Sequence, residues 1–371
     1  MRRVGGTESG GESEGKSEET ATGRRWFADW RVWGTIAITV VCLWLAMRDV
    51  PMDEVWAAMG RADLVLLLTG SVPAYIAWAW VRGLRWRYLT ESIAPMSRSE
   101  MFRASAIGAM ANNLLPLRIG EIARSWYLAR ETGTSAASVL ASVAIERVID
   151  VVMLLLLVLI GLAVAGGDSD EASLLARGAL VLLPIGLAPL VGLIVLRVRP
   201  EFIFGIVRFF ARPLPDRIGA GIESVLHHFA DGLGALRGGR HLVWILLHSA
   251  TIWLLLSTIP ITVGIMAFGI DLGSPAETLI LSWVVLAVVG VAVALPSAPG
   301  FIGPYQLAFK AVLVKFGVDP ATAFAVGLLV WFVMWVTLTT LGLVVLRVRH
   351  TSLSELTARP ERSPNTDPDA T

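Results

Sequence analysis

The sequence has few charged residues and almost no cysteine. Charged side chains make up 16% of its 371 residues, whereas soluble globular domains carry about 25%. Cys42 is the single cysteine, so neither an intrachain disulfide nor a multi-cysteine metal site can form. Two of the five histidines, His227 and His228, are adjacent, but no further ligands stand at suitable positions. These absences exclude an ordinary soluble domain and a disulfide-rich scaffold, and they predict no metal site.

Signatures of covalent chemistry are also missing from the sequence. It contains no nucleophile elbow, no phosphate-binding P-loop, no histidine-rich metal motif and no aspartate-rich motif of the kind that binds Mg²⁺ with a diphosphate. We therefore expect a protein that is not an enzyme and that uses no cofactor. We also expect no nucleic-acid partner.

Apolar residues dominate the chain instead. They make up 55% of it, the mean hydropathy is +0.67, and several runs reach the roughly 20 residues that cross a hydrocarbon core. We predict an all-α polytopic membrane protein with about eight transmembrane helices. The predicted spans are residues 33–47, 64–81, 148–166, 180–196, 242–268, 278–295, 301–316 and 323–346. Segment 101–117 contains Arg103, two asparagines and Pro116, and it is predicted to be re-entrant.

The placement of arginine predicts the orientation in the membrane. Arginines gather after the second span and in 197–240, so both regions should be cytoplasmic. The first group consists of Arg82, Arg85, Arg87, Arg98 and Arg103. With eight crossings, both termini lie in the cytoplasm and the protein belongs to the inner (cytoplasmic) cell membrane.

The chain divides into a membrane domain and two polar tails. Residues 1–30 and 349–371 are polar and are predicted to be disordered, and residues 31–348 form the membrane domain. Within it, 201–236 has apolar residues at helical spacing on both sides of Pro213 and Pro215. This pattern predicts two amphipathic helices at the cytoplasmic surface.

A dense group of charges lies between 112 and 150. Arg118, Glu121 and Arg124 stand at i, i+3 and i+6, which would place them on one helix face, and Glu146, Arg147 and Asp150 follow. Three positive and three negative groups could balance to zero and brace a helix junction. Alternatively, the arginines bind an anionic group such as a lipid phosphate. In that hypothesis the headgroup site consists of Asn112, Asn113, Pro116, Arg118, Gly120, Glu121, Arg124, Glu146, Arg147 and Asp150.

The second half of the chain echoes this segment. LPLRIG (115–120) and LPSAPG (295–300) share Leu-Pro and a later glycine, and similar helix starts follow at Gly133 and Gly317. Such paired interruptions indicate a possible internal two-fold repeat and mark the substrate site in transporters. The residues predicted to form a second-half cavity are Pro296, Pro299, Gly300, Gly303, Gln306 and Lys310.

These two segments resemble the lysylphosphatidylglycerol synthase transmembrane region family, also called flippase-like. The first matches the pattern Pro-x-Arg-x-Gly-Glu-x-x-Arg followed by Glu-Arg-x-x-Asp, and the second a Pro-x-x-Pro-Gly segment. Many relatives have Glu at the position of Gln306 and Arg near Trp331, so a charge pair of the family is absent here. In bifunctional relatives an aminoacyl-transferring domain follows, and we expect this chain to correspond to the membrane part alone. The resemblance implies the handling of a phospholipid or polyprenyl-linked headgroup between leaflets.

Three hypotheses follow from the sequence. The first is a protein that binds and translocates an anionic membrane lipid. The second is a non-catalytic accessory or scaffold for a separately encoded glycosyltransferase or lipid-modifying enzyme, docked through 201–236. The third, an ion-coupled transporter, needs an isolated acid deep in a span, and Asp150 lies close to a span end.

Overall fold

We describe the fold from a computed structural model of the chain. It describes residues 30–91, 93, 96–115, 118–165, 188, 191–192, 195–196, 198–211, 239–293 and 297–349. Nearly all of both predicted tails, most of the predicted span 180–196 and the second predicted amphipathic helix lie outside these residues. So do Pro116 and Pro296.

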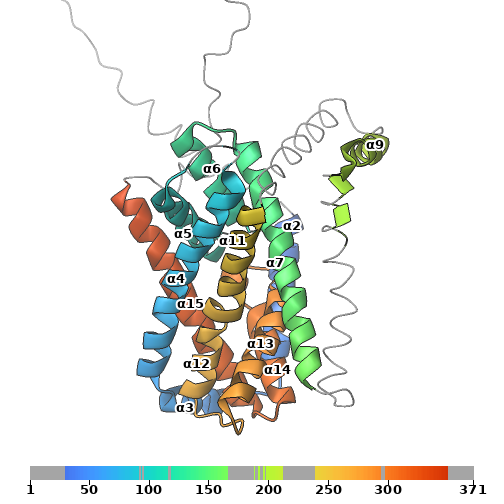
Figure 1. The fold of residues 1–371 in the computed structure, drawn as a ribbon. Coiled ribbons are helices and arrows are strands. Elements are labelled where there is room, and N and C mark those ends of the chain that lie inside the picture. The colour runs from blue at the N-terminus through green and yellow to red at the C-terminus, as the bar shows by residue number, and fades with distance from the viewer. Residues whose placement is uncertain are drawn as a thin grey trace, which may run out of the picture.

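The described residues form helices and short connections, without a strand (Figure 1). This confirms the predicted all-α class. The helices are α2 (Trp30–Met47), α3 (Met52–Arg61), α4 (Leu64–Thr90), α5 (Arg98–Leu114), α6 (Gly120–Thr132), α7 (Ala136–Ala165), α9 (Pro200–Ala211), α11 (Gly239–Ala250), the π-helix η2 (Thr251–Leu256), α12 (Ile259–Ala267), α13 (Pro275–Ala292), the 3₁₀-helix η3 (Pro299–Phe301), α14 (Pro304–Lys315) and α15 (Pro320–Val348). Helix α9 covers the first predicted amphipathic helix.

Within the residues that the structure describes, fewer helices could cross a membrane than the eight that the sequence predicts for the whole chain. By length and composition, four described segments are long and apolar enough: α4, α11 to α12, α13 and α15. A fifth is possible if α2 and α3, which are bent by 79°, count as one span. The predicted span 301–316 is wrong, because η3 ends at Phe301 and α14 begins only at Pro304 and has 12 residues, about 18 Å of helix.

Local signals in the sequence fix several helix ends. Ser97 and Glu100 form a capping box at the start of α5. Asp63 and Asp319 accept hydrogen bonds from backbone N–H groups at the starts of α4 and α15. Gly133 ends α6 with φ +67°, a conformation that glycine adopts without strain. These ends set which side chains each helix turns inward.

Two runs of helices have the same order and nearly equal lengths. Helices α5, α6 and α7 have 17, 13 and 30 residues, and α13, α14 and α15 have 18, 12 and 29. A break separates the first two helices of each run, and a positive-φ glycine, Gly133 or Gly317, precedes the third. Each break also holds a residue other than glycine with positive φ, Arg118 at 57° and Phe301 at 62°.

The first two helices of each run form a hairpin, and the hairpins enter from opposite ends of the molecule. At one end of the molecule, the backbone N–H of Asp63 at the start of α4 donates to the Ala267 carbonyl at the end of α12. Helix α13 starts shortly after α12 at this end, and α14 ends just before α15. At the other end, α6 finishes beside the end of α15, where Glu131 pairs with Arg349. Helices α7 and α15 therefore run in opposite directions (Figure 1). The sequence predicted one re-entrant segment, 101–117, whereas the described residues contain two helical hairpins, α5–α6 and α13–α14.

The two breaks meet in the middle of the molecule. The side chain of Arg118 donates a hydrogen bond to the carbonyl oxygen of Val293 at the end of α13. Trp335 Nε1 on α15 donates to the Asn113 carbonyl at 3.2 Å. One buried apolar core surrounds α12 to α15, and another surrounds α4 to α7. The meeting point of the breaks lies between these two cores.

Candidate functional site

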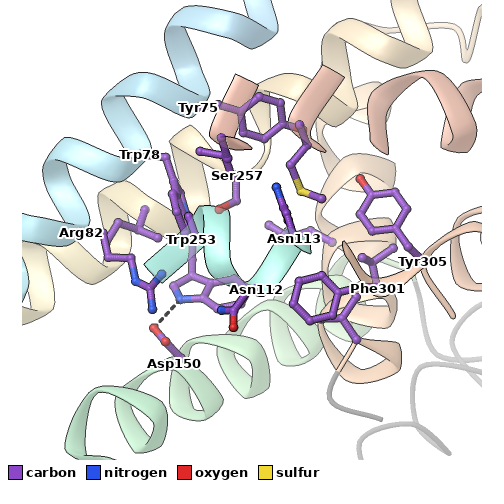
Figure 2. A pocket seen from close by; sticks show the side chains of 18 of the residues that line it. Tyr75, Trp78, Arg82, Asn112, Asn113, Asp150, Trp253, Ser257, Phe301 and Tyr305 are labelled. Carbon is purple, nitrogen blue, oxygen red and sulfur yellow. Dashed lines mark hydrogen bonds between the residues drawn. The ribbon is translucent and has the colours of Figure 1, made fainter. Parts of the chain in front are cut away.

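A cavity of about 230 Å³ lies where the breaks meet. Residues from both runs of helices and from α4 and η2 line it, so its wall combines segments that lie far apart in the sequence (Figure 2). One part of the wall is charged and the rest is aromatic and apolar. The charged side chains are Arg82, Arg85, Arg118, Glu121, Arg147 and Asp150.

Helix α4 supplies two arginines that the sequence analysis misplaced. Arg82 and Arg85 were predicted in a cytoplasmic loop, but α4 continues to Thr90, and these residues are only 4% and 1% exposed. Together with Tyr75 and Trp78 they follow helical spacing and line the cavity from one face. This spacing was visible in the sequence and would have indicated that the helix extends past Val81.

Glu146 on α7 is the centre of the charged wall. Its carboxylate is fully buried and lies within 3.1 Å of the guanidinium groups of four arginines. They are Arg82 at 3.0 Å, Arg85 at 3.1 Å, Arg124 at 3.1 Å and Arg147 at 2.5 Å. Glu146 therefore holds α4, α6 and α7 together, and it does not itself line the cavity.

Asp150 and Glu121 flank Glu146 and complete the network. Asp150 accepts from Arg85 at 2.7 Å and from Trp253 Nε1 at 3.0 Å, and it pairs with Arg147 at 2.8 Å. In α6, which is too short to cross a membrane, burial raises the pKa of Glu121, but three neighbouring guanidinium groups outweigh it and lower that pKa to about 2. Glu121 is therefore a carboxylate at physiological pH.

Arg124 was predicted to bind a headgroup, but the structure places it inside the protein. It is fully buried, pairs with Glu121 and Glu146, and lies over the Trp86 ring at 4.4 Å. It does not line the cavity. Its position indicates that Arg124 stabilises the junction of α6 and α7.

Arg118 occupies a different position from the other arginines. Helix α6 begins at Gly120, so the predicted helix face shared by Arg118, Glu121 and Arg124 does not form. Arg118 lies in the preceding turn, with its guanidinium 5.2 Å from the centre of the Phe301 ring and a hydrogen bond to the Val293 carbonyl. Within the described part of the chain, no carboxylate forms an ion pair with Arg118. Its positive charge is available to a molecule in the cavity.

The predicted asparagines line the cavity and also fix the breaks. Asn112 Oδ1 accepts from the Gly120 backbone N–H at 3.0 Å, and Asn113 Nδ2 donates to Thr339 Oγ1 at 3.1 Å. Gly120 was predicted to admit a headgroup. It instead allows α5 and α6 to touch, because a Cβ there would overlap the Gly108 carbonyl oxygen and the Asn112 side chain.

This close approach predicts that Gly120→Ala destabilises the protein. The new methyl group meets backbone, which cannot rotate away, so we expect a loss of about 1–3 kcal/mol in the free energy of unfolding. Gly60→Ala is the matched control, because a Cβ at that helical position meets nothing within 4 Å. Thermal unfolding of both variants in detergent tests this, and an equal effect would contradict the proposed packing role.

The second half of the chain lines the cavity through residues other than the predicted ones that the structure describes. Phe301 and Tyr305 line it, whereas Pro299, Gly300, Gly303, Gln306 and Lys310 do not. Pro296 lies outside the described residues. Several of these residues make hydrogen bonds elsewhere. The Gly300 carbonyl accepts from Trp331 Nε1 at 2.6 Å, Gln306 Oε1 accepts from the Gly303 N–H at 2.7 Å, and Lys310 donates to the Arg48 carbonyl at 2.9 Å. Pro299 begins η3.

Aromatic side chains form the remaining wall. Tyr75, Trp78, Trp253, Phe301 and Tyr305 surround the space beside the arginines (Figure 2). Trp253 belongs to the π-helix η2, a type of distortion that is frequent at functional sites. Because pockets of this composition bind small molecules or parts of them, the site could hold an anionic group together with an apolar or ring-shaped one. In the described ranges, no three His, Cys, Asp or Glu side chains are grouped for a metal ion.

The fold and the site define a helical membrane protein with a buried, arginine-rich cavity between two helical hairpins. The chain belongs to the family described as the lysylphosphatidylglycerol synthase TM region, which it matches over residues 32–342. It is also similar to a protein named Glycosyltransferase AglD from Haloferax volcanii, with 26% identity over 317 residues. The match covers 79% of this chain and 50% of that protein, so the chain spans about half the length of this relative. No solved structure matches the chain significantly.

Proposed function

We propose that the protein binds an anionic membrane lipid through the arginine-lined cavity. The observation that carries this proposal is the excess of guanidinium groups over carboxylates around one cavity, with an aromatic wall beside them. Arginine donates several hydrogen bonds in a plane and suits phosphate oxygens. The acids Glu121 and Asp150 would orient the guanidinium groups, and Asn112 and Asn113 could hydrogen-bond the headgroup.

We further propose that the protein moves this lipid between leaflets. The matching lengths of the two runs and their opposite directions support an internal inverted repeat. Transporters often bind substrate at the interface of such repeats, where helices are broken. On this proposal the protein lies in the cell membrane with both termini in the cytoplasm, and the arginine end of α4 faces the cytoplasm.

A second candidate is a membrane accessory for a separately encoded glycosyltransferase or lipid-modifying enzyme. The relative named a glycosyltransferase is about twice as long as the matched part, which favours a membrane part that works beside another domain or protein. Helix α9 would offer a docking surface, since Phe202 on it is exposed. On either proposal the chain carries out no covalent chemistry and binds no cofactor.

Retention of lipid by the purified protein tests the first proposal. We expect mass spectrometry of the intact protein, released from mild detergent with equal amounts of anionic and zwitterionic phospholipid, to show preferential retention of the anionic lipid. Lys310→Ala is a charge-removing control, because Lys310 contacts the Arg48 carbonyl and does not line the cavity. It should retain lipid as the wild type does. Equal retention of both lipids by the wild type would reject the proposal and favour the accessory role.

Reconstitution tests translocation separately from binding. In vesicles, a fluorescent anionic lipid should exchange between leaflets faster with the protein than without it, and a zwitterionic analogue should not. Binding without exchange would leave the lipid site in place and reject transport.

A further inference from the structure

The charged side chains at the cavity do not balance within the described residues. The segment 112–150 alone carries three charges of each sign at this site, and helix α4 adds Arg82 and Arg85. The ion-pair network and Arg118 beside it together contain five guanidinium groups and three carboxylates, an excess of two positive charges. They are those of Arg82, Arg85, Arg118, Arg124 and Arg147, and of Glu121, Glu146 and Asp150.

Much of this positive charge lies out of contact with water. Arg82, Arg85 and Arg124 are at most 4% exposed, whereas the Arg147 side chain is 39% exposed. Buried positive charge that the three carboxylates do not fully balance is unfavourable. Several hydrogen-bond donors are also unused: the Nε atoms of Arg85, Arg118 and Arg147 are buried and have no acceptor within the described part of the chain. Both observations indicate that a negatively charged acceptor belongs in the site.

Four of the five arginines line one cavity and approach it from three places. Arg82 and Arg85 come from α4, Arg118 from the turn before α6, and Arg147 from α7. Such an arrangement can surround a group that has oxygens on several sides. A phosphodiester offers two unesterified oxygens and one negative charge, whereas a phosphate monoester offers three and carries up to two charges. The monoester fits both the number of donors and the excess charge.

We propose that the headgroup bound in this cavity carries two negative charges, as a phosphate monoester or a diphosphate does. This inference rests on the proposed lipid binding and specifies its substrate class. The bound group neutralises the excess of two, and the single charge of a phosphodiester leaves one positive charge uncompensated. The neighbouring side chains Trp78, Phe301 and Leu338 provide an apolar surface for whatever is attached to the phosphate.

Two phospholipids with identical acyl chains make a direct test. Phosphatidic acid is a phosphate monoester and phosphatidylglycerol is a phosphodiester, and each is offered in nanodiscs of phosphatidylcholine or by competition in detergent. Because the second pKa of a phosphate monoester is about 6, phosphatidic acid carries two charges at about pH 8 and one at about pH 5. We expect it to bind about tenfold more tightly than phosphatidylglycerol at the higher pH. At the lower pH the preference should disappear.

The outcomes separate this inference from the proposed function. Equal affinity for the two lipids at the higher pH, both above phosphatidylcholine, would overturn the two-charge assignment and leave anionic-lipid binding intact. No preference over phosphatidylcholine would overturn both. If inorganic phosphate displaces phosphatidic acid at an equal concentration, the two-charge chemistry stands but its source is a free phosphate.

A pair of variants changes the excess in opposite directions. Arg118→Gln lowers it to one and should reduce the preference for phosphatidic acid over phosphatidylglycerol. Glu121→Gln raises it to three and should preserve or increase that preference. If either variant fails to fold, the comparison of the two lipids in the wild-type protein still tests the inference. An unchanged preference for phosphatidic acid in a folded Arg118→Gln protein would contradict the inference.

Discussion

Glu146→Gln is expected to lower the free energy of unfolding by about 3–5 kcal/mol, the range found when one partner is removed from a buried ion pair. Four guanidinium groups lie within 3.1 Å of this fully buried carboxylate. The substitution keeps the size and shape of the side chain but removes the negative charge. Arg124, which is fully buried and pairs with Glu146 and Glu121, then keeps a single carboxylate partner. The three helices α4, α6 and α7 should separate most readily in this variant.

Glu131→Gln is the matched control for this prediction. Glu131 also pairs with an arginine, Arg349, but at the end of the molecule, where both side chains are partly exposed. Such pairs contribute little to stability, so thermal unfolding in detergent should be nearly unchanged. If Glu146→Gln unfolds at the same temperature as the wild type, the network is not what joins these helices. The charges at the cavity would then serve ligand binding alone.

Much of the charged network follows from local sequence. Glu121, Arg124, Glu146, Arg147 and Asp150 were predicted as one cluster, and the structure brings them into contact. Their spacing on α6 and α7 is short range, so helical periodicity suffices to predict which side chains share a face. The membrane class follows in the same way from composition and the lengths of apolar runs.

The misplaced arginines show where local reasoning failed. Arginine counting assigns Arg82 and Arg85 to a cytoplasmic loop, because positive charge near a span end is typical of loops. Their partners, Glu146 and Asp150, lie more than 60 residues away in the sequence. No local pattern therefore predicts that Arg82 and Arg85 are buried. The face shared with Tyr75 and Trp78 was the available signal.

The hairpin of α13 and α14 was equally hard to predict. Residues 278–295 have the length and hydropathy of a span, and α13 passes the same test in the structure. What turns the chain at η3 is a set of tertiary contacts: Trp331 Nε1 donates to the Gly300 carbonyl, and Arg118 donates to the Val293 carbonyl. The Pro-Gly segment predicted the position of the break correctly. The direction in which the chain continues after the break depends on Trp331 of α15 and Arg118 of the first half of the chain.

Arg118→Ala is expected to abolish most anionic-lipid binding while leaving the protein folded. Arg118 lines the cavity, and its partners in the described residues are a carbonyl oxygen and the Phe301 ring, so its removal leaves no carboxylate unpaired. A hydrogen bond to a charged group contributes about 1.5–3 kcal/mol, which corresponds to a loss in affinity of roughly ten- to a hundredfold. Retention of anionic lipid, measured by mass spectrometry of the intact protein, and thermal unfolding are compared with the wild type.

Arg124→Ala and Arg118→Lys are the control variants for this experiment. Arg124 is buried between two carboxylates outside the cavity, so its removal should lower stability first. Arg118→Lys keeps the charge without the planar fork, and it should restore part of the binding. If Arg118→Ala retains lipid like the wild type, the cavity is not the headgroup site and the network only braces the helices. If Arg124→Ala instead stays folded and loses lipid, the headgroup reaches deeper than the cavity wall.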